Sequence, residues 1–236
     1  MKHAFGARLA LSALGLLCAT GAQAAGGLAV GVKAGTAGIG VEAVTSLNSV
    51  FNLRGVGNFF NYDYDTTEDG VDYQSELELR SYGLLLDLHP FKGSFRITAG
   101  GLGNGNGATL VATCPGSCEV GDVTIQGNDA RLDGAVDFKK FAPYVGLGFG
   151  NAMVGSGLYG IFDIGVMFQG EPDVALAASG SAIVTGSNGL SRPVPDLSSD
   201  PEVQDAVAQE QASLQDDLKD FQFYPVVNIG IGYRFF

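Results

Sequence analysis

The stretch Ile229-Gly230-Ile231-Gly232-Tyr233-Arg234-Phe235 places an apolar or aromatic residue at every second position. Because side chains alternate between the two faces of a β-strand, this pattern predicts a strand with one apolar face and one face of small or polar residues. The same period of two recurs along the chain, which predicts eight strands at residues 27–35, 38–45, 50–62, 73–88, 94–101, 142–151, 157–168 and 224–236. Within 73–88 the apolar phase changes near residues 81–83, and Gly83 there predicts a β-bulge.

Composition agrees with an all-β protein and excludes several classes. The chain has 236 residues, 36 of them glycine, with 46% hydrophobic and 16% charged residues and a net charge of −12. This apolar content excludes intrinsic disorder, and the acidic balance argues against a nucleic-acid binder. The glycines lack the three-residue period of collagen. They suit the bends and the crowded interior of a small barrel.

The first residues predict an export signal. Lys2 and Arg8 precede an apolar run at residues 9–19, and Ala22-Gln23-Ala24 has the small-x-small pattern of a cleavage site. We therefore expect a signal peptide at 1–24 and one barrel domain at 25–236. Without Lys2 and Arg8, 11 basic and 25 acidic residues remain, a net charge of −14. The alternatives are a buried N-terminal helix or a lipoprotein signal at Cys18, which the bulky residues before that cysteine disfavour.

Export also decides how the remaining cysteines are interpreted. Cys114-Pro115-Gly116-Ser117-Cys118 leaves an even pair around a tight turn, which predicts a disulfide between Cys114 and Cys118. A redox motif would favour a two-residue spacing, and a zinc site would need further ligands. After removal of the signal peptide, His89 is the one histidine of the chain. We therefore expect no bound metal and no cofactor.

The connections between the predicted strands alternate in length. Residues 46–49, 89–93 and 152–156 are short, whereas 63–72, 102–141 and 169–223 are longer, and only 36–37 breaks the rule. This alternation favours eight strands over ten, although 109–127 and 174–185 contain alternating apolar residues that could hide a further strand pair. In the last long connection, Asp200-Pro201-Glu202 provides a cap, an initial proline and an early acidic residue, which predicts an amphipathic helix at 201–220. It is either a surface helix, a cover for the barrel mouth, or a helix that docks on the outer part of a strand.

An eight-stranded sheet with one apolar face can be a soluble sandwich or a membrane barrel. The end of the chain resembles the closing strand of bacterial outer-membrane barrels, where alternating apolar residues precede Tyr-x-Phe, here Tyr233 and Phe235. Phe236 departs from that pattern by one position. The mature chain thus resembles small eight-stranded antiparallel barrels of the OmpA, OmpX and OmpW kind. The resemblance implies the outer membrane of a Gram-negative bacterium, contact with outer-membrane lipid and lipopolysaccharide, and recognition of Tyr233, Phe235 and Phe236 by the barrel-insertion machinery.

Charged residues on the polar strand faces are then expected in the lumen. The expected lumen network contains Lys33, Glu42, Arg54, Glu76, Glu78, Arg80, Arg96, Asp163 and Arg234. An eight-stranded barrel is only just wide enough for its own side chains, and buried charges must be paired. We therefore expect a plugged lumen. Glycines on the same face, such as Gly146, Gly148 and Gly232, keep a narrow hydrated pore as the alternative.

One outer loop is strongly acidic. Its carboxylates are Asp63, Asp65, Glu68, Asp69 and Asp72. Clustered carboxylates are candidate ligands for divalent cations such as calcium, although the spacing does not match an EF-hand. The plainer interpretation is a solvated loop with aromatic residues at the membrane boundary. Phe59, Phe60, Tyr62 and Tyr64 would form the outer aromatic girdle, and Phe91, Phe95, Tyr233, Phe235 and Phe236 the inner one.

These observations favour a non-enzymatic outer-membrane protein with a structural or surface-interaction role. The alternative is a narrow, porin-like channel for small or apolar molecules, as the resemblance to OmpW implies. A lipid-modifying enzyme is disfavoured, because such a site needs a nucleophile with a nearby base and His89 is expected in a turn on the opposite side.

Overall fold

The computed structural model of this chain describes residues 27–68, 71–114, 116–120, 123–127, 129–152, 154–155, 157–186 and 188–235. The expected signal peptide at 1–24, together with Asp69 and Phe236, lies outside the described residues.

Eight antiparallel strands close into a ring. They are β1 (Leu28–Gly35), β2 (Gly38–Ser46), β3 (Phe51–Glu68), β4 (Val71–Leu88), β5 (Phe95–Asn104), β10 (Phe141–Phe149), β11 (Gly157–Phe168) and β15 (Phe223–Arg234). The last strand pairs with the first, with Val30 opposite Tyr233, and β4 pairs with β5 to complete the ring. These are the eight strands predicted from the alternating pattern.

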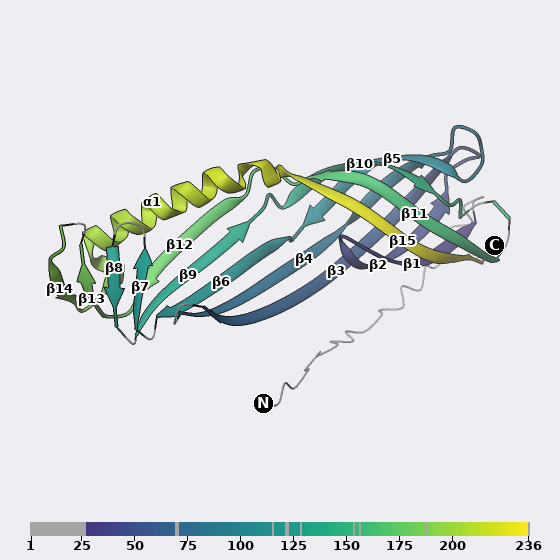
Figure 1. Cartoon of the computed structure of the whole chain (residues 1–236). Coiled ribbons are helices and arrows are strands. Elements are labelled where there is room, and N and C mark those ends of the chain that lie inside the picture. Colours follow the sequence, from purple (N-terminus) through teal and green to yellow (C-terminus); the bar gives the residue numbers. More distant parts are fainter. Residues whose placement is uncertain are drawn as a thin grey trace, which may run out of the picture.

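The hairpin of β3 and β4 continues far beyond the ring and carries the same sheet into an extension, whose part of the sheet we call the extended sheet. Its strand β4 pairs with β6 (Gly107–Cys114), which is followed by β9 (Ala130–Asp137) and β12 (Asp173–Ser179). A smaller sheet of β7 (Ser117–Val120), β8 (Val123–Gln126), β13 (Ala182–Thr185) and β14 (Ser191–Val194) lies at the far tip (Figure 1). Both segments suspected of hiding strands do form strands, but these join the extension and leave the ring at eight.

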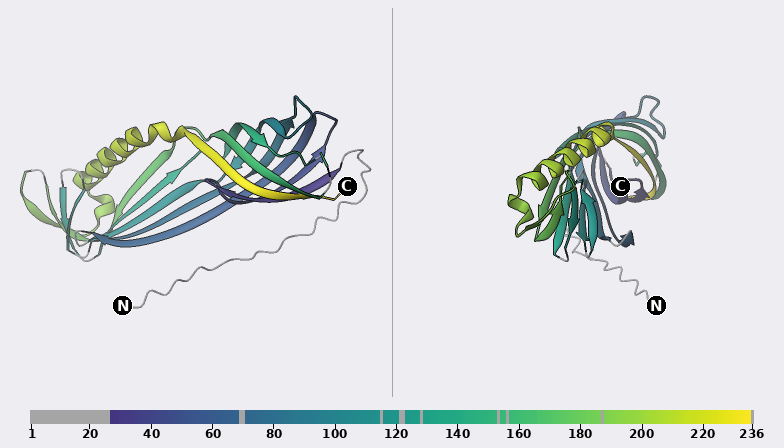
Figure 2. Two further views of the ribbon diagram at one scale, coloured as in Figure 1. Left: turned by 45° about the vertical axis from the view of Figure 1, so that its right-hand side comes forward. Right: turned by 60° about the vertical axis from the view of Figure 1, so that its left-hand side comes forward.

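A single long helix runs along the extension. Helix α1 (Pro201–Leu218) lies between the short 3₁₀ turns η1 (Leu197–Ser199) and η2 (Lys219–Gln222). As predicted, Asp200 caps its N-terminus by accepting a hydrogen bond from the Val203 amide at 3.2 Å. Figures 1 and 2 show α1 along the β12 side of the extended sheet and β3 along its opposite side. In the described part of the chain, no helix combines the length and apolarity needed to cross a membrane.

The ring is apolar on its outside and polar on its inside. In β1, Val30 and Val32 are exposed whereas Lys33 is buried, and β15 exposes Ile229 and Ile231 but buries Asn228. The exposed side chains of the other ring strands include Ile39, Val41, Leu84, Leu86, Ile97, Val145, Leu147, Phe149, Phe162 and Ile164. Exposed apolar side chains over all these strands are typical of a surface that contacts lipid or protein. A soluble sandwich would instead bury its apolar strand faces.

In the extension the inner face of the sheet is the apolar one, whereas in the ring it is the outer face. The predicted β-bulge near Gly83 is therefore wrong. The β3–β4 register is unbroken from Phe51 opposite Leu88 to Glu68 opposite Val71. Alternation therefore puts Leu84 and Leu86 on the outer face of the ring but Leu77 and Leu79 on the inner face of the extension. The apparent phase change near Gly83 is thus a change of environment along one regular strand.

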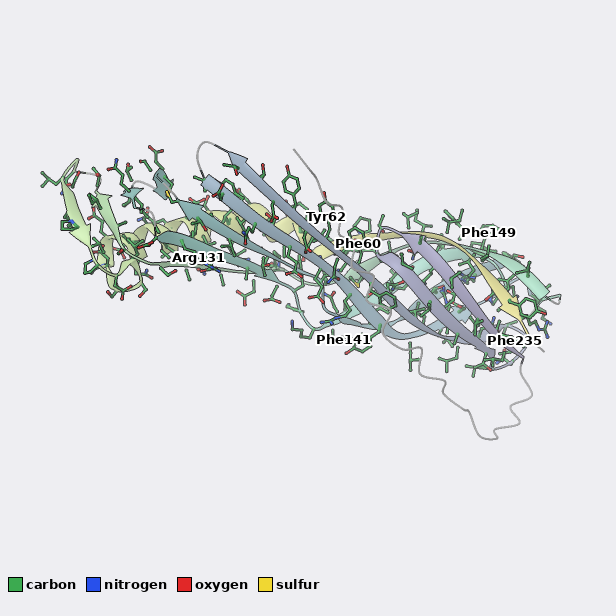
Figure 3. All side chains as sticks on the ribbon, turned by 90° about the horizontal axis from the view of Figure 1, so that it is seen from below. Phe60, Tyr62, Arg131, Phe141, Phe149 and Phe235 are labelled. Atoms are coloured by element: carbon green, nitrogen blue, oxygen red, sulfur yellow. A yellow bond between two sulfur atoms is a disulfide. The ribbon has the colours of Figure 1, made fainter. Side chains whose placement is uncertain are left out.

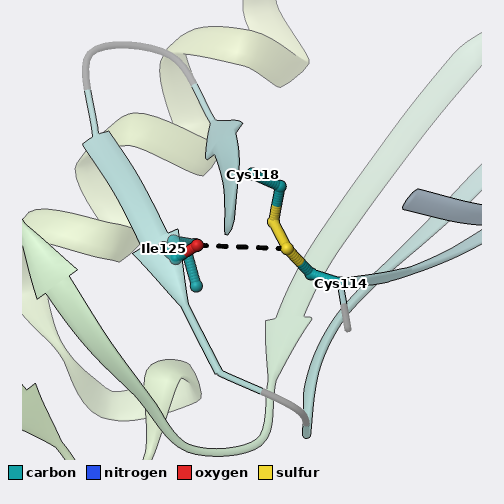
Figure 4. The surroundings of a disulfide bond; sticks show 3 residues. All are labelled: Cys114, Cys118 and Ile125. Atoms are coloured by element: carbon teal, nitrogen blue, oxygen red, sulfur yellow. Dashed lines mark hydrogen bonds between the residues drawn. A yellow bond between two sulfur atoms is a disulfide. The ribbon is translucent and has the colours of Figure 1, made fainter. Parts of the chain in front are cut away.

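A disulfide ties the tip to the extended sheet. Cys114 at the end of β6 is bonded to Cys118 at the start of β7, and Cys114 Sγ lies 3.9 Å from the carbonyl oxygen of Ile125 (Figure 4). Around it, the small sheet, α1 and the extended sheet share one apolar core that includes Val184, Leu197 and Val203.

Candidate functional site

The lumen of the ring contains a dense network of ion pairs centred on Arg54. Its guanidinium donates to Asp87 at 2.9 Å, and to Glu42 and Asp163 at 3.1 Å each. These four side chains come from β3, β2, β4 and β11, and none is more than 3% exposed. One arginine therefore links four strands across the lumen.

Two further cations complete the network. Arg96 donates to Asp163 at 2.7 Å and to the carbonyl of Gly150, and Lys33 lies 3.5 Å from Glu42. Thr98 donates to Asp87 at 2.6 Å. Three cations thus face three carboxylates, which is the pairing that buried charges require.

An apolar layer lies between this network and the extension. It includes Val56, Leu85, Leu102, Tyr144 and Met167. A void beside the layer is lined by Arg54 and Asp163 on the ion side and by Asn58 and Ser81 on the side of the extension. It measures about 20 Å³, which is room for about one water molecule.

Lumen glycines make room for larger side chains. A Cβ at Gly146 would lie 2.6 Å from the Tyr144 hydroxyl, and one at Gly148 would lie 2.7 Å from Arg96 Nε. These distances are shorter than ordinary contacts, so a larger residue at either position would displace its neighbour. The glycines therefore accommodate the side chains that fill the lumen instead of leaving an open path.

The structure divides the expected lumen network. Lys33, Glu42, Arg54, Arg96 and Asp163 come together as described.

The other four expected members lie elsewhere. Glu76, Glu78 and Arg80 belong to the part of β4 beyond the ring, where an exposed Arg80–Glu78 pair spans 3.3 Å. Arg234 lies near the opposite end and donates to the carbonyl of Gly155 at 2.5 Å. Glu76, Glu78 and Arg80 are separated from the network because β4 continues well beyond the ring, and Arg234 is separated because it is the last residue of β15.

The network member that sequence reasoning missed is Asp87. Leu84, Leu86 and Leu88 alternate along β4 on the outer face. Because side chains alternate between the two faces, Asp87 between Leu86 and Leu88 lies on the inner face. Its partner on β3 in the strand pairing is Asn52, also buried.

His89 is a buried structural residue just after β4. Its Nδ1 lies 3.0 Å from the Gly93 carbonyl oxygen and 3.1 Å from that of Phe95, and its Nε2 lies 3.1 Å from Asn52 Nδ2. These contacts fit a neutral imidazole that donates from Nδ1 and accepts at Nε2.

The second candidate site is a concave apolar surface on the extension, which we call the trough. It is lined by Tyr62 and Tyr64 of β3, Leu77 of β4, Leu110 of β6, Val174 and Leu176 of β12, and Leu214 and Leu218 of α1. The cavity along it measures about 310 Å³.

Aromatic side chains line the β3 rim of the trough. Phe60, Tyr62 and Tyr64 stack with ring centroids 6.4 Å apart in each step and are 41%, 52% and 51% exposed. Figure 3 labels the first two of them, Phe60 and Tyr62, on β3. By strand alternation the three stacked residues share the inner face with Asn58, whereas Phe59 faces outward. Tyr62 and Tyr64 thus line the trough, and Phe60 continues their row on the same face, so these three residues do not belong to the expected outer girdle. On the outer face, Phe59, Tyr82 and Phe141 are exposed instead.

The acidic segment expected as a loop is mostly strand. Asp63 and Asp65 belong to β3 opposite Glu76 and Gln74, and Asp72 accepts from the Thr67 hydroxyl at 2.7 Å. The Glu68 side chain and all of Asp69 lie outside the described part of the structure. Among the described residues, no three His, Cys, Asp or Glu side chains are grouped so that they could hold a metal ion.

The β12 rim of the trough is protected by α1. Gln211 and Gln215 accept hydrogen bonds from the Leu176 and Val174 amides at 3.2 and 3.0 Å, and Gln215 also donates to the Pro172 carbonyl at 2.7 Å. Side-chain amides therefore occupy backbone groups of an edge strand that would otherwise be open to pairing.

The start of α1 is anchored electrostatically. Arg192 on β14 contacts both carboxylate oxygens of Asp200, at 2.5 and 2.7 Å, and Glu202 at 3.1 Å. The hydrogen bonds from Arg192 lower the pKa of Asp200 below its usual value. The charged form of Asp200 thus holds the tip sheet and the helix together.

Two solved structures share this fold. CarO2 of Acinetobacter baumannii aligns with a TM-score of 0.55 at 17% identity, over 89% of this chain and 98% of that one. CarO of Acinetobacter baumannii aligns with a TM-score of 0.54 at 20% identity, over the same shares. The likeness supports a β-barrel fold for the ring of eight strands. No protein-family model and no curated protein sequence matches the chain.

Proposed function

We propose that this protein is a non-enzymatic outer-membrane β-barrel of a Gram-negative bacterium, whose lumen is closed and whose extension acts as a surface-interaction module outside the membrane. The ring of strands carries an apolar outer surface suited to lipid, whereas the outer face of the extension carries Asp63, Glu76 and Arg80. The disulfide fits an exported protein.

The observation that carries this proposal is the ion network of the lumen. Arg54 bonds to three carboxylates from three other strands, and an apolar layer lies above them. A solute would have to break several buried charge pairs to pass, and each broken pair would leave a charge unpaired in a low-dielectric interior.

The alternative function is a narrow channel for small or apolar molecules. The void of about 20 Å³ beside Arg54 and Asp163 is the observation that favours it. A channel would require this void to connect with both ends of the ring.

Planar-bilayer recordings separate the two functions. The purified protein and an Arg80→Ala variant should both give no unitary currents, because Arg80 lies outside the network. A known porin in the same bilayers is the positive control. Stable unitary currents from the unaltered protein, abolished or altered in an Arg54→Ala variant, would overturn the closed lumen.

A further inference from the structure

The two rims of the trough are treated differently by the fold. On the β12 rim, Gln211 and Gln215 cover the backbone. On the β3 rim, the pairing with β2 stops at Phe59, and β3 continues through Glu68 paired only to β4 among the described residues. An edge of nine residues, 60–68, therefore presents unpaired backbone groups to solvent.

Exposed apolar side chains lie directly beside this open edge. Tyr62 and Tyr64 line the trough next to Leu77 and Leu110. Phe60 stacks on Tyr62, so three aromatic side chains recur at every second position of the same strand face. An extended peptide can add to a sheet as a further strand where two conditions are met. The edge must offer free backbone hydrogen-bonding groups, and it must offer side-chain contacts at every second residue. The β3 edge meets both conditions. A lipid chain would satisfy the apolar contacts but not the backbone edge.

The negative charge of the β3–β4 hairpin beyond the ring favours a basic strand as the partner of this edge. Residues 60–79 contain seven carboxylates and no lysine or arginine. Asp63 and Asp65 lie on the outer face of β3, on alternate positions to the aromatic residues. A second copy of this chain would bring the same carboxylates against them, and like charges opposed across a strand pair are unfavourable.

We propose that the β3 edge binds an extended basic peptide segment of another protein. Its backbone continues the five-stranded sheet, its apolar side chains at alternate positions rest on Phe60, Tyr62 and Tyr64, and its intervening lysine or arginine side chains face Asp63 and Asp65. The proposal rests on the proposed function only in that the extension lies in water.

Three synthetic peptides of nine residues test the proposal, matching the length of the unpaired edge. One alternates lysine and valine, one alternates glutamate and valine, and one is the lysine peptide with proline at its central valine. Fluorescence anisotropy is measured against the full protein in neutral detergent. We expect the lysine–valine peptide to bind, and both others to bind at least about tenfold more weakly, because proline interrupts strand pairing and glutamate is repelled by the carboxylates of the hairpin.

Variants locate the binding. Asp63→Asn with Asp65→Asn should weaken the lysine–valine peptide, and so should Tyr62→Ser with Tyr64→Ser. Asp205→Asn with Asp217→Asn makes the same charge change on exposed positions of α1 and should leave binding unchanged. A heat-modifiable gel shift, which reports the folded ring, should be retained by all three variants.

Three results would overturn the proposal or the position of the site. Equal binding of the lysine and proline peptides would overturn strand addition, and equal loss in the α1 variant would overturn the β3 edge as the site. Absence of peptide binding, or binding of a fluorescent fatty acid in its place, would overturn the proposal. None of these results changes the conductance recordings, so a failure here is distinct from a failure of the closed lumen.

Discussion

At the residue scale, the interior of the ring depends on one guanidinium. Arg54 contacts three carboxylates at 2.9–3.1 Å. Each of these also contacts a second cation, which is Lys33 for Glu42 and Arg96 for Asp163 and Asp87. Removing Arg54 would leave three negative charges to two positive ones in a buried space. An arginine fits here because its planar fork offers several donors in fixed directions.

An Arg54→Met substitution should therefore lower the free energy of unfolding by about 3–5 kcal/mol, since one side of a buried ion network is removed. Urea unfolding in detergent, followed by the heat-modifiable gel band, measures the change. Arg80→Met is the matched control, because its pair with Glu78 is exposed. Such exposed pairs contribute about 1 kcal/mol or less. Equal effects of the two substitutions would refute the central role of Arg54.

Asp200 makes the tip of the extension sensitive to acid. Its pKa in the folded protein is lowered by the hydrogen bonds from Arg192, so its stabilising contribution is complete above the ordinary carboxyl value of 3.8 and is lost as pH falls through the folded value. Amide hydrogen exchange in α1, corrected for intrinsic rates, should accelerate below about pH 4.

The matched variant for this prediction is Asp200→Asn. Asparagine still caps a helix but cannot form the charged pair with Arg192. The variant should exchange faster at neutral pH and show a flatter acid dependence. An unchanged acid response in Asp200→Asn would assign the effect to another carboxyl group.

At the element scale, the ring strands and helix α1 could be predicted from sequence, whereas the short strands of the tip could not. In β1, β10 and β15 an unbroken apolar alternation follows from the outer face of the ring, so the pattern is strong. The strands β7, β8, β13 and β14 have four residues each, which is too short for a periodic signal. Helix α1 was predictable because its start carries a local capping signal in Asp200 and Pro201.

Helix α1 covers the β12 edge through the side chains of Gln211 and Gln215. The double substitution Gln211→Ala with Gln215→Ala should uncover the amides of Val174 and Leu176 and promote association between molecules through that edge. Sedimentation in detergent would detect the larger species. Gln209→Ala, an exposed change on the same helix, should remain like the unaltered protein. A double variant with unchanged sedimentation would mean that α1 protects this edge without its glutamine side chains.

At the scale of the whole molecule, one hairpin passes through two environments. Along β4, the outward-facing residues are Leu86, Leu84 and Tyr82 in the ring, and then Arg80 and Glu78 in the extension. The side of the strand that meets its apolar surroundings thus reverses where the ring ends. Sequence alternation alone reports only a change of phase there, because it does not distinguish a bulge from a change of surroundings. The same ambiguity put Glu76, Glu78 and Arg80 into the expected lumen network and left Asp87 out.

A nitroxide scan along β4 in lipid bilayers measures this reversal of polarity residue by residue. Single cysteines for labelling replace outward-facing residues in turn, in protein that keeps its natural disulfide and is reconstituted in lipid bilayers: Leu86, Leu84, Tyr82, Arg80, Glu78 and Glu76. We expect oxygen, which concentrates in lipid, to relax the labels at 84 and 86 most strongly. A water-soluble nickel complex should relax those at 76, 78 and 80, with the crossover at 82. Lipid-like accessibility at 76 and 78, or water-like accessibility at 84 and 86, would contradict the reversal.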